Sequence, residues 1–188
     1  MSDPDVLADD EYRAPVLESR TVFDGAVWNV QRDRFSFGGA ELVREYLVHP
    51  GAVAILAEDD HGRVLLIKQY RHPIGCRDWE LPAGLRDMDG EAPVDTARRE
   101  LAEEADVDAA EWNLLTEFSP SPGGSSEMLS VYHARGLTPR VTAFNRTAEE
   151  AEIEVRWVPL EDAVAAVLDG RLHNGILALA VLNAHARR

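Results

Sequence analysis

Residues 84–107 read GLRDMDGEAPVDTARRELAEEADV, and the pattern of residues 90–107 predicts a helix. Pro93 suits a first helical turn, and Glu91 and Asp95 lie near the positive end of the helix dipole. Apolar residues recur at helical spacing at Val94, Ala97, Leu101 and Ala105. We therefore expect an amphipathic helix whose apolar stripe faces the protein interior.

Three glutamates crowd together near the end of this helix. At 3.6 residues per turn, Glu100, Glu103 and Glu104 share one face, beside the apolar stripe. Like charges at this spacing cost only a few tenths of a kcal/mol per pair on an exposed helix, so a solvated acidic face is one interpretation. The other is that Mg²⁺ or Mn²⁺ lies between the carboxylates, because both cations prefer oxygen ligands.

The surrounding residues favour the second interpretation. The stretch, preceded by ELPAG, resembles the signature of the Nudix hydrolases: Gly, five residues, Glu, seven residues, Arg-Glu-apolar-x-Glu-Glu-x-Gly-apolar. The matching positions are Gly84, Glu91, Arg99, Glu100, Leu101, Glu103, Glu104 and Val107. Two positions depart from the signature: six residues separate Gly84 from Glu91, and Asp106 replaces the glycine.

Other motifs resemble the ADP-ribose pyrophosphatase branch of this family: VLLIKQYR, WELPAGL, SPSPGGSSE and EVRWVPLEDA. This resemblance implies Mg²⁺- or Mn²⁺-dependent hydrolysis of ADP-ribose to AMP and ribose 5-phosphate by a homodimeric pyrophosphatase. Three alternatives stay open: hydrolysis of another nucleoside diphosphate derivative, a non-catalytic module that binds ADP-ribose, and a plain interaction domain.

The resemblance also implies a role for each residue of the acidic cluster. Glu100 and Glu104 are expected to bind the metal, together with the main-chain carbonyl of Ala83. Glu103 is expected to act as a further ligand or to support one. Arg99 precedes Glu103 by four residues, so an ion pair between them could orient that carboxylate for catalysis.

A loop glutamate and two arginines complete the expected catalytic and phosphate-binding set. Glu127, at the end of SPSPGGSSE, matches the position to which the resemblance assigns a general base or a metal ligand. Arg71, in KQYRHP, and Arg44, in VREYLVHPG, are candidates for binding diphosphate oxygens. For all three residues the alternative is an ordinary exposed side chain.

The remaining substrate contacts are expected from an aromatic residue and from backbone. Trp28 is a candidate for stacking on the adenine, and a core or interface tryptophan is the alternative. Gly84 and Leu85 are expected to border the ribose-diphosphate through their backbone.

The rest of the chain predicts an α+β protein with the α/β/α sandwich and mixed sheet of the Nudix fold. We expect a polar, mobile segment over residues 1–20, a β-rich dimerisation segment over 21–48 and the Nudix domain over 49–188. Within the last, residues 52–70 predict a β-hairpin, residues 112–118, 129–134 and 153–158 predict strands, and residues 159–170 and 174–187 predict helices.

Net charge, hydrophobicity and cysteine content argue against a nucleic-acid-binding, membrane-spanning or disulfide-bonded protein. The 188 residues carry a formal net charge of −15, so no basic stripe is present to bind nucleic acid or an anionic membrane. No apolar run approaches the roughly 20 residues of a membrane span, and the acidic amino terminus has no signal-peptide pattern. Cys76 is the only cysteine, which suits a reducing cytoplasm.

Overall fold

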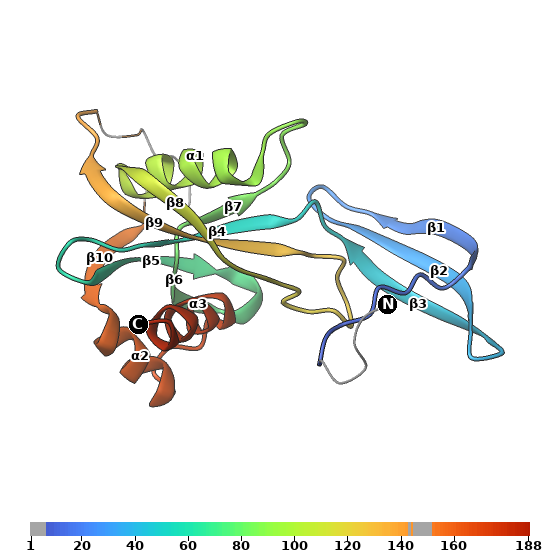
Figure 1. Ribbon diagram of the computed structural model, residues 1–188. Helices are drawn as coiled ribbons and strands as arrows, with labels where there is room; N and C mark the ends of the chain where they lie inside the picture. Colours follow the sequence, from blue (N-terminus) through green and yellow to red (C-terminus); the bar gives the residue numbers. More distant parts are fainter. Residues whose placement is uncertain (1–6, 143, 145–151) are drawn as a thin grey trace. The chain divides into compact units, whose positions relative to one another are not determined.

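The structure is a computed structural model that describes residues 7–142, 144 and 152–188 (Figure 1). The chain divides into two compact units. The first comprises Met1–His49 with Gly123–Ser125, and the second comprises Pro50–Pro122 with Ser126–Arg188. Each unit has its own sheet architecture.

The first unit is an antiparallel meander of three strands, β1 (Val16–Asp24), β2 (Asn29–Phe37) and β3 (Ala40–Val48). Gly38 and Gly39, at φ 59° and 79°, form the two-residue turn between β2 and β3, where positive φ values match the twist of a hairpin. Strands were expected from residue 21 onward. β1 begins earlier, at Val16, because its first residues pair with the end of β2.

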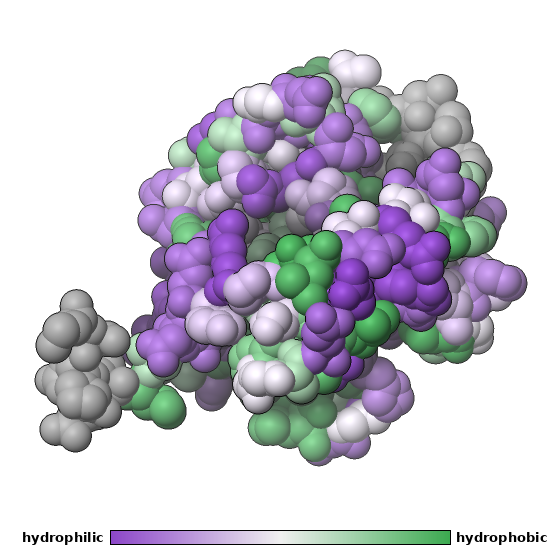
Figure 2. Space-filling model, turned by 90° about the vertical axis from the view of Figure 1, so that its right-hand side faces the viewer, coloured by the Kyte–Doolittle hydropathy of each residue, from purple (hydrophilic) through white to green (hydrophobic). Residues whose placement is uncertain are grey.

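The meander exposes hydrophobic side chains along with its charged ones. No described residue of β1, β2 or β3 is buried, and Val16, Phe23 and Val43 are each at least half exposed, at 55%, 60% and 50%. Figure 2 shows hydrophobic residues at the surface beside hydrophilic ones. A small sheet gains most of its stability when one face is covered, so this unit has apolar area left to bury.

The second unit is built around the buried strand β4 (Ala52–Ala57). It is the second strand of a mixed sheet in the order β7 (Ala83–Leu85), β4, β9 (Leu129–Pro139), β8 (Val107–Phe118). β4 runs parallel to β9 and antiparallel to β7. The strands expected near 112–118 and 129–134 are confirmed, and both extend further than their apolar cores indicated.

A second sheet has the order β10 (Glu154–Pro159), β5 (Arg63–Arg71), β6 (Cys76–Glu80), and the short helix η1 (His72–Ile74) links β5 to β6. The expectation of a hairpin over 52–70 is therefore wrong. The turn itself forms, but β4 and β5 belong to different sheets and only one isolated bridge, Glu58 to Val64, joins them in the described chain. Every residue of β4 is buried, and such a strand pairs along both edges, here with β7 and β9.

Helices cover both faces of the central sheet (Figure 1). On one face, α1 (Pro93–Ala105) packs Ala97 and Leu101 against Val53 and Ile55. On the other face, α2 (Leu160–Leu168) and α3 (Gly175–Ala186) pack Leu160, Leu177 and their neighbours against Ala54 and Leu56. Successive residues of β4 point to opposite faces, so one strand supplies both cores.

This layering is the expected α/β/α sandwich. All three helices were expected, and Asn174 caps α3 by accepting a hydrogen bond at Oδ1 from the N–H of Leu177 at 3.0 Å. None of the helices in the described residues has the length and apolar character needed to cross a membrane.

Candidate active site

The backbone of β7 and the glutamates of α1 meet at very short range. A Cβ atom added to Gly84 would lie 2.0 Å from Oε1 of Glu100, a distance that no real side chain could tolerate. A side chain at this position would therefore force the carboxylate of Glu100 to move.

Glu104 lies one helical turn further along the same face. Its side chain is buried, with the residue only 8% exposed. Its Oε2 accepts a hydrogen bond from the backbone N–H of Ala83 at 2.8 Å. The structure thus places Glu100 and Glu104 against two consecutive residues of β7, and their role as metal ligands stays a prediction.

Arg99 holds the carboxylates around it in fixed positions. Its Nη1 donates to Oε1 of Glu100 at 2.6 Å and lies 3.5 Å from Oε2 of Glu103, the i,i+4 pair expected from the sequence. Its Nε and Nη2 donate to the two oxygens of Glu91, each at 3.3 Å. Thr96, a buried residue on α1, donates its hydroxyl hydrogen to Glu91 at 2.9 Å.

This network shifts the pKa values of its members. The hydrogen bonds from Arg99 hold the pKa of Glu91 below its usual value, with help from the Thr96 hydroxyl. The pKa of Arg99 is raised in turn, chiefly by its hydrogen bond to Glu91 and also by Glu100. Both groups are therefore charged at neutral pH. Glu91 holds the guanidinium of Arg99, which in turn orients Glu100 and Glu103.

The donor set fits a hard divalent cation by its chemistry. Glu100, Glu103 and Glu104 supply carboxylate oxygens beside the backbone of Ala83, and Mg²⁺ and Mn²⁺ prefer oxygen ligands. Within the described residues, no three acidic, histidine or cysteine side chains already converge on one point. The guanidinium of Arg99 lies between Glu100 and Glu103 and offsets their charge.

The two departures from the signature both have a structural account. The segment between Gly84 and Glu91, which is one residue longer than in the signature, ends in a turn of Met88 to Glu91, where Gly90 adopts φ 80°. Asp106 ends α1 in the left-handed region at φ 53°. Its Oδ1 also accepts a hydrogen bond from the N–H of Phe144 at 2.6 Å, which a glycine could not do.

Glu127 lies just before β9, at the same end of the sheet as Leu85. Leu129 is paired with Ala52 of β4, and Ala52 is paired on its other side with Leu85. The carbonyl of Met128 also accepts a hydrogen bond from Ala52 at 3.1 Å. This arrangement is compatible with a role for Glu127 at the carboxylate site, but that role stays a prediction.

Arg71 contacts a carboxylate that the sequence analysis did not select. Its Nε and Nη2 donate to the two oxygens of Glu80 at 2.7 and 2.6 Å, and Glu80 is buried. The signal was an acid in the apolar stretch before PAGL, but only the pairing of β5 with β6 reveals its partner. Thr96 was missed for a similar reason, because its partner Glu91 lies in a loop.

The remaining expected substrate contacts belong to the first unit. The ring of Trp28 stacks on His49, with centroids 4.7 Å apart and planes 17° from parallel. Arg44 donates from Nη1 to the carbonyl of its neighbour Val43 at 2.8 Å. The expected site residues are thus divided between the two units, with Trp28 and Arg44 on one and the carboxylates on the other.

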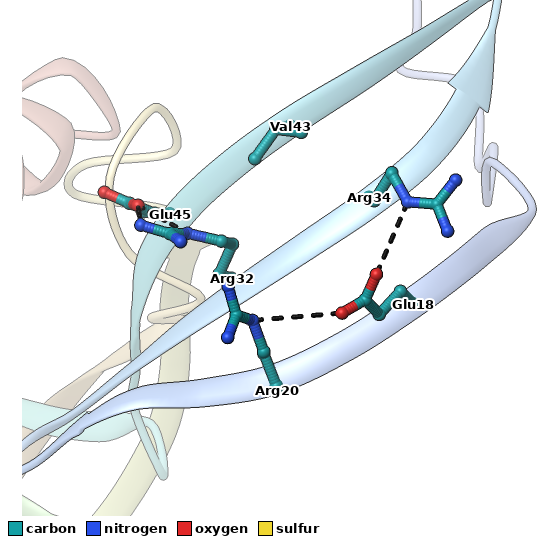
Figure 3. Close-up of a pocket in the computed structure, with 6 residues that line it drawn as sticks. All are labelled: Glu18, Arg20, Arg32, Arg34, Val43 and Glu45. Atoms are coloured by element: carbon teal, nitrogen blue, oxygen red, sulfur yellow. Dashed lines mark hydrogen bonds and ion pairs between the residues drawn. The ribbon is translucent and has the colours of Figure 1, made fainter.

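The sheet of the first unit also carries a hollow of about 360 Å³ (Figure 3). Its lining residues are charged apart from one valine: Glu18, Arg20, Arg32, Arg34, Val43 and Glu45. Glu18 pairs with Arg20 and Arg34, and Glu45 pairs with Arg32. The three arginines exceed the two glutamates by one charge, but each arginine is paired, since Arg34 also contacts Glu41 outside the lining. This hollow therefore has neither the carboxylate cluster of a metal site nor a group of unpaired cations that would suit a phosphate.

Comparison with known proteins shows the family to which the chain belongs. The Nudix domain family model matches residues 48–178. An ADP-ribose pyrophosphatase of Mycobacterium tuberculosis (strain ATCC 25618 / H37Rv) is 41% identical over 177 residues, covering 94% of this chain and 85% of that protein. An ADP-ribose pyrophosphatase of Bacillus subtilis (strain 168) is 39% identical over 172 residues, covering 88% of this chain and 91% of that protein.

A solved structure has the same fold. The chain described as an ADP compounds hydrolase aligns with a TM-score of 0.78 at 19% identity, and the alignment covers 96% of each chain. A mixed sheet between helices, with glutamates of one helix seated on a Pro-Ala-Gly strand, is the arrangement of a Nudix protein. This chain belongs to the Nudix family.

Proposed function

We propose that this protein hydrolyses the pyrophosphate bond of ADP-ribose, giving AMP and ribose 5-phosphate, with Mg²⁺ or Mn²⁺ as cofactor. The observation that carries the proposal is the placement of Glu100 and Glu104 on the backbone of Ala83 and Gly84. The relatives at 41% and 39% identity that are named ADP-ribose pyrophosphatases support the choice of substrate.

The carboxylates and the backbone of Ala83 would hold the cation. When bound, a divalent cation polarises phosphoryl oxygens and offsets the charge of the departing phosphate. The protein supplies the fixed geometry: Ala83 holds Glu104 by a hydrogen bond, and Arg99 holds Glu100 and Glu103. These contacts hold each carboxylate close to the strand or to Arg99 before the substrate binds, although the three carboxylates do not yet converge on one point.

Glu127 is our candidate for the group that accepts a proton from the attacking water. It lies half-buried at the end of the sheet where β7 and β9 approach the carboxylate helix. A glutamate in this position could equally serve as a further metal ligand. Glu127→Gln separates the two roles, because loss of a base flattens the pH–rate profile, whereas loss of a ligand raises the metal concentration needed for half activity.

We propose that the substrate's diphosphate is bound by Arg71 and Arg44 and that Trp28 stacks on the adenine. Gly84 and Leu85 would contact the ribose-diphosphate through their backbone. The stacking of Trp28 on His49 supports part of this assignment, since it holds the indole flat for a further ring. The side chain of Arg71, which makes two hydrogen bonds to Glu80, is still 44% exposed.

We further propose a homodimer in which residues 21–48 form the dimerisation segment and residues 49–188 the catalytic domain. Support comes from the exposed apolar side chains of the three-stranded sheet, which include Val16, Phe23 and Val43. Cytoplasmic location is also proposed, because the only cysteine, Cys76, is an exposed free thiol.

The direct test is release of AMP and ribose 5-phosphate from ADP-ribose by the purified protein with Mg²⁺. EDTA should stop the reaction and added Mg²⁺ should restore it. A panel that includes sugar nucleotides and dinucleotides, ranked by kcat/KM, would reveal a different preferred substrate. Tight binding of ADP-ribose without turnover would instead identify a binding module.

A further inference from the structure

Arg86 follows β7 directly and is fixed in place by its backbone. Its N–H donates to the carbonyl of Gly51 at 3.1 Å, which extends the pairing of β7 with β4 by one residue. Arg86 lies two residues beyond Gly84, against which Glu100 packs. The side chain of Arg86 therefore starts at the edge of the carboxylate site.

The side chain of Arg86 packs over a glycine that leaves room for it. A Cβ atom at Gly51 would lie 3.5 Å from Cδ of Arg86, 3.6 Å from its Nη1 and 3.2 Å from the carbonyl oxygen of Met128. Gly51 also adopts φ 93°, a conformation that other residues avoid. The arginine thus packs over Gly51, a residue that also lies close to the carbonyl of Met128.

The guanidinium has an unmet hydrogen-bonding requirement. Nε of Arg86 is buried from solvent and has no hydrogen-bond partner among the residues that the structure describes, a condition shared there only with Oδ1 of Asn183. Buried polar atoms are nearly always paired, and an orphan donor on a charged group is costly. An acceptor oxygen supplied by a ligand would remove this deficit.

Alternation along β7 places Arg86 on the α1 side of the sheet, because Gly84, two residues earlier, faces Glu100 of α1. The positive charge of Arg86 acts on the hydroxyl of Tyr132, whose pKa is raised by burial and by Glu117. Glu117 is itself engaged, since Ser130 donates to it at 2.7 Å. Tyr132 packs in the same core cluster as Leu101 of α1, on this side of the sheet.

We propose that Arg86 is a specificity-determining residue that binds a phosphoryl oxygen of the substrate's diphosphate. This inference deepens the proposed function and rests on it for the identity of the substrate. Phosphate is the favoured ligand chemistry because a guanidinium presents Nε–H and Nη–H as a planar fork that matches two phosphate oxygens. It would add a positive charge beside a site whose own side chains are mostly acidic.

The first test observes the guanidinium directly and needs no turnover. The Nε–H resonance of Arg86 in the full-length protein, assigned by its loss in Arg86→Lys, is followed while inorganic pyrophosphate is added with Mg²⁺. A saturable shift of this resonance is expected. A resonance that stays unchanged up to the highest soluble pyrophosphate concentration would overturn the proposal, whether or not other resonances move.

The second test uses kinetics and stability together. Arg86→Met keeps the chain length and removes the charge, so KM for ADP-ribose should rise at least tenfold while kcat changes less, and Arg86→Lys should fall between the two. The melting temperature of Arg86→Met should stay equal or rise, because the orphan donor is gone. An unchanged KM with a lowered melting temperature would indicate a packing role and overturn the proposal.

Arg171→Met is the matched control, since Arg171 is an exposed arginine paired with Asp169 on α2's C-terminal side. It should change neither KM nor the Arg86 resonance. Failure of the proposed function is distinguishable: if the wild type does not hydrolyse ADP-ribose but the Arg86 resonance still responds to pyrophosphate, the substrate is wrong and the phosphate site stands.

Discussion

Gly84 and Glu100 are so close that the carboxylate of Glu100 occupies the space a side chain on Gly84 would need, with Oε1 2.0 Å from the Cβ position. This contact joins β7 to α1 and fixes the distance between the helix carboxylates and the strand backbone. Because packed interiors tolerate little added volume, a single methyl group at Gly84 has to move Glu100.

Gly84→Ala should therefore damage activity more than stability. We expect kcat with ADP-ribose to fall at least 100-fold, because Glu100 leaves its position beside Gly84, and the free energy of unfolding to fall by about 1–3 kcal/mol. Steady-state kinetics and urea denaturation measure the two effects. Gly175→Ala is the control, since nothing lies within 4 Å of its added methyl group; equal losses in the two variants would contradict the account.

Glu91 should make the protein sensitive to acid. Its pKa is lower in the folded protein than in the unfolded chain, so its contribution to stability is complete above the unfolded pKa of about 4.3 and disappears as the pH falls through the folded pKa. Glu91→Gln should lower the melting temperature at pH 7 and reduce its dependence on pH below about 4.3. A melting temperature that changes equally at pH 7 and pH 3 would show that the carboxylate charge is not involved.

Thr96 tests the same network from the helix side. Thr96→Val keeps the buried shape and removes the hydroxyl that donates to Glu91, so we expect a loss of about 1 kcal/mol in the free energy of unfolding. Thr96→Ser, which keeps the donor, should retain the bond and lose only packing. Urea denaturation measures the free energy of unfolding of both variants. Equal losses in Thr96→Ser and Thr96→Val would show that the hydrogen bond from the Thr96 hydroxyl to Glu91 does not stabilise the network.

Asp106 should tolerate glycine better than alanine. Asp106→Gly loses the hydrogen bond to Phe144 but removes the cost of φ 53°, so the free energy of unfolding should change by less than about 1 kcal/mol. Asp106→Ala keeps the backbone strain and loses the bond, and it should cost about 1–3 kcal/mol. Denaturant titration gives the free energy of unfolding of both variants. An Asp106→Ala protein as stable as the Asp106→Gly protein would show that the left-handed backbone at residue 106 carries no strain.

If the sheet of β1, β2 and β3 forms the dimer interface, the protein should dimerise in a concentration-dependent manner. Val43→Glu places a charge on an exposed apolar residue beside Glu18 and Glu45. If a second copy covers this face, the variant should sediment as a monomer, whereas the wild type sediments as a dimer. Asp169→Ser, on an exposed position after α2, should leave sedimentation unchanged, and a dimeric Val43→Glu protein would exclude this face.

Local signals were sufficient for the helices and for the acidic cluster. The helix of residues 93–105 was predictable because its proline, its acids and its apolar spacing all lie within the segment. The pairing of strands was not, since β4 joins β7 and β9 from distant parts of the chain, and the adjacent strand β5 enters another sheet. A turn between two strands does not establish that they pair along their length.

At the candidate active site, too, only residues that are close in sequence could be assigned together. Glu100, Glu103 and Glu104 were recognisable because their spacing within one helix places them on one face. Glu80 and Arg86 were missed, because the role of each depends on a residue brought close by the fold: Arg71 for Glu80 and Gly51 for Arg86.

The central claim is that Glu100, Glu104 and the carbonyl of Ala83 bind a divalent cation for pyrophosphate hydrolysis. The most direct measurement is anomalous scattering from a crystal grown with Mn²⁺ and a non-hydrolysable ADP-ribose analogue. The account predicts a manganese peak within bonding distance, roughly 2.2 Å, of these oxygens. Clear density for the nucleotide with no manganese peak at this position would contradict it.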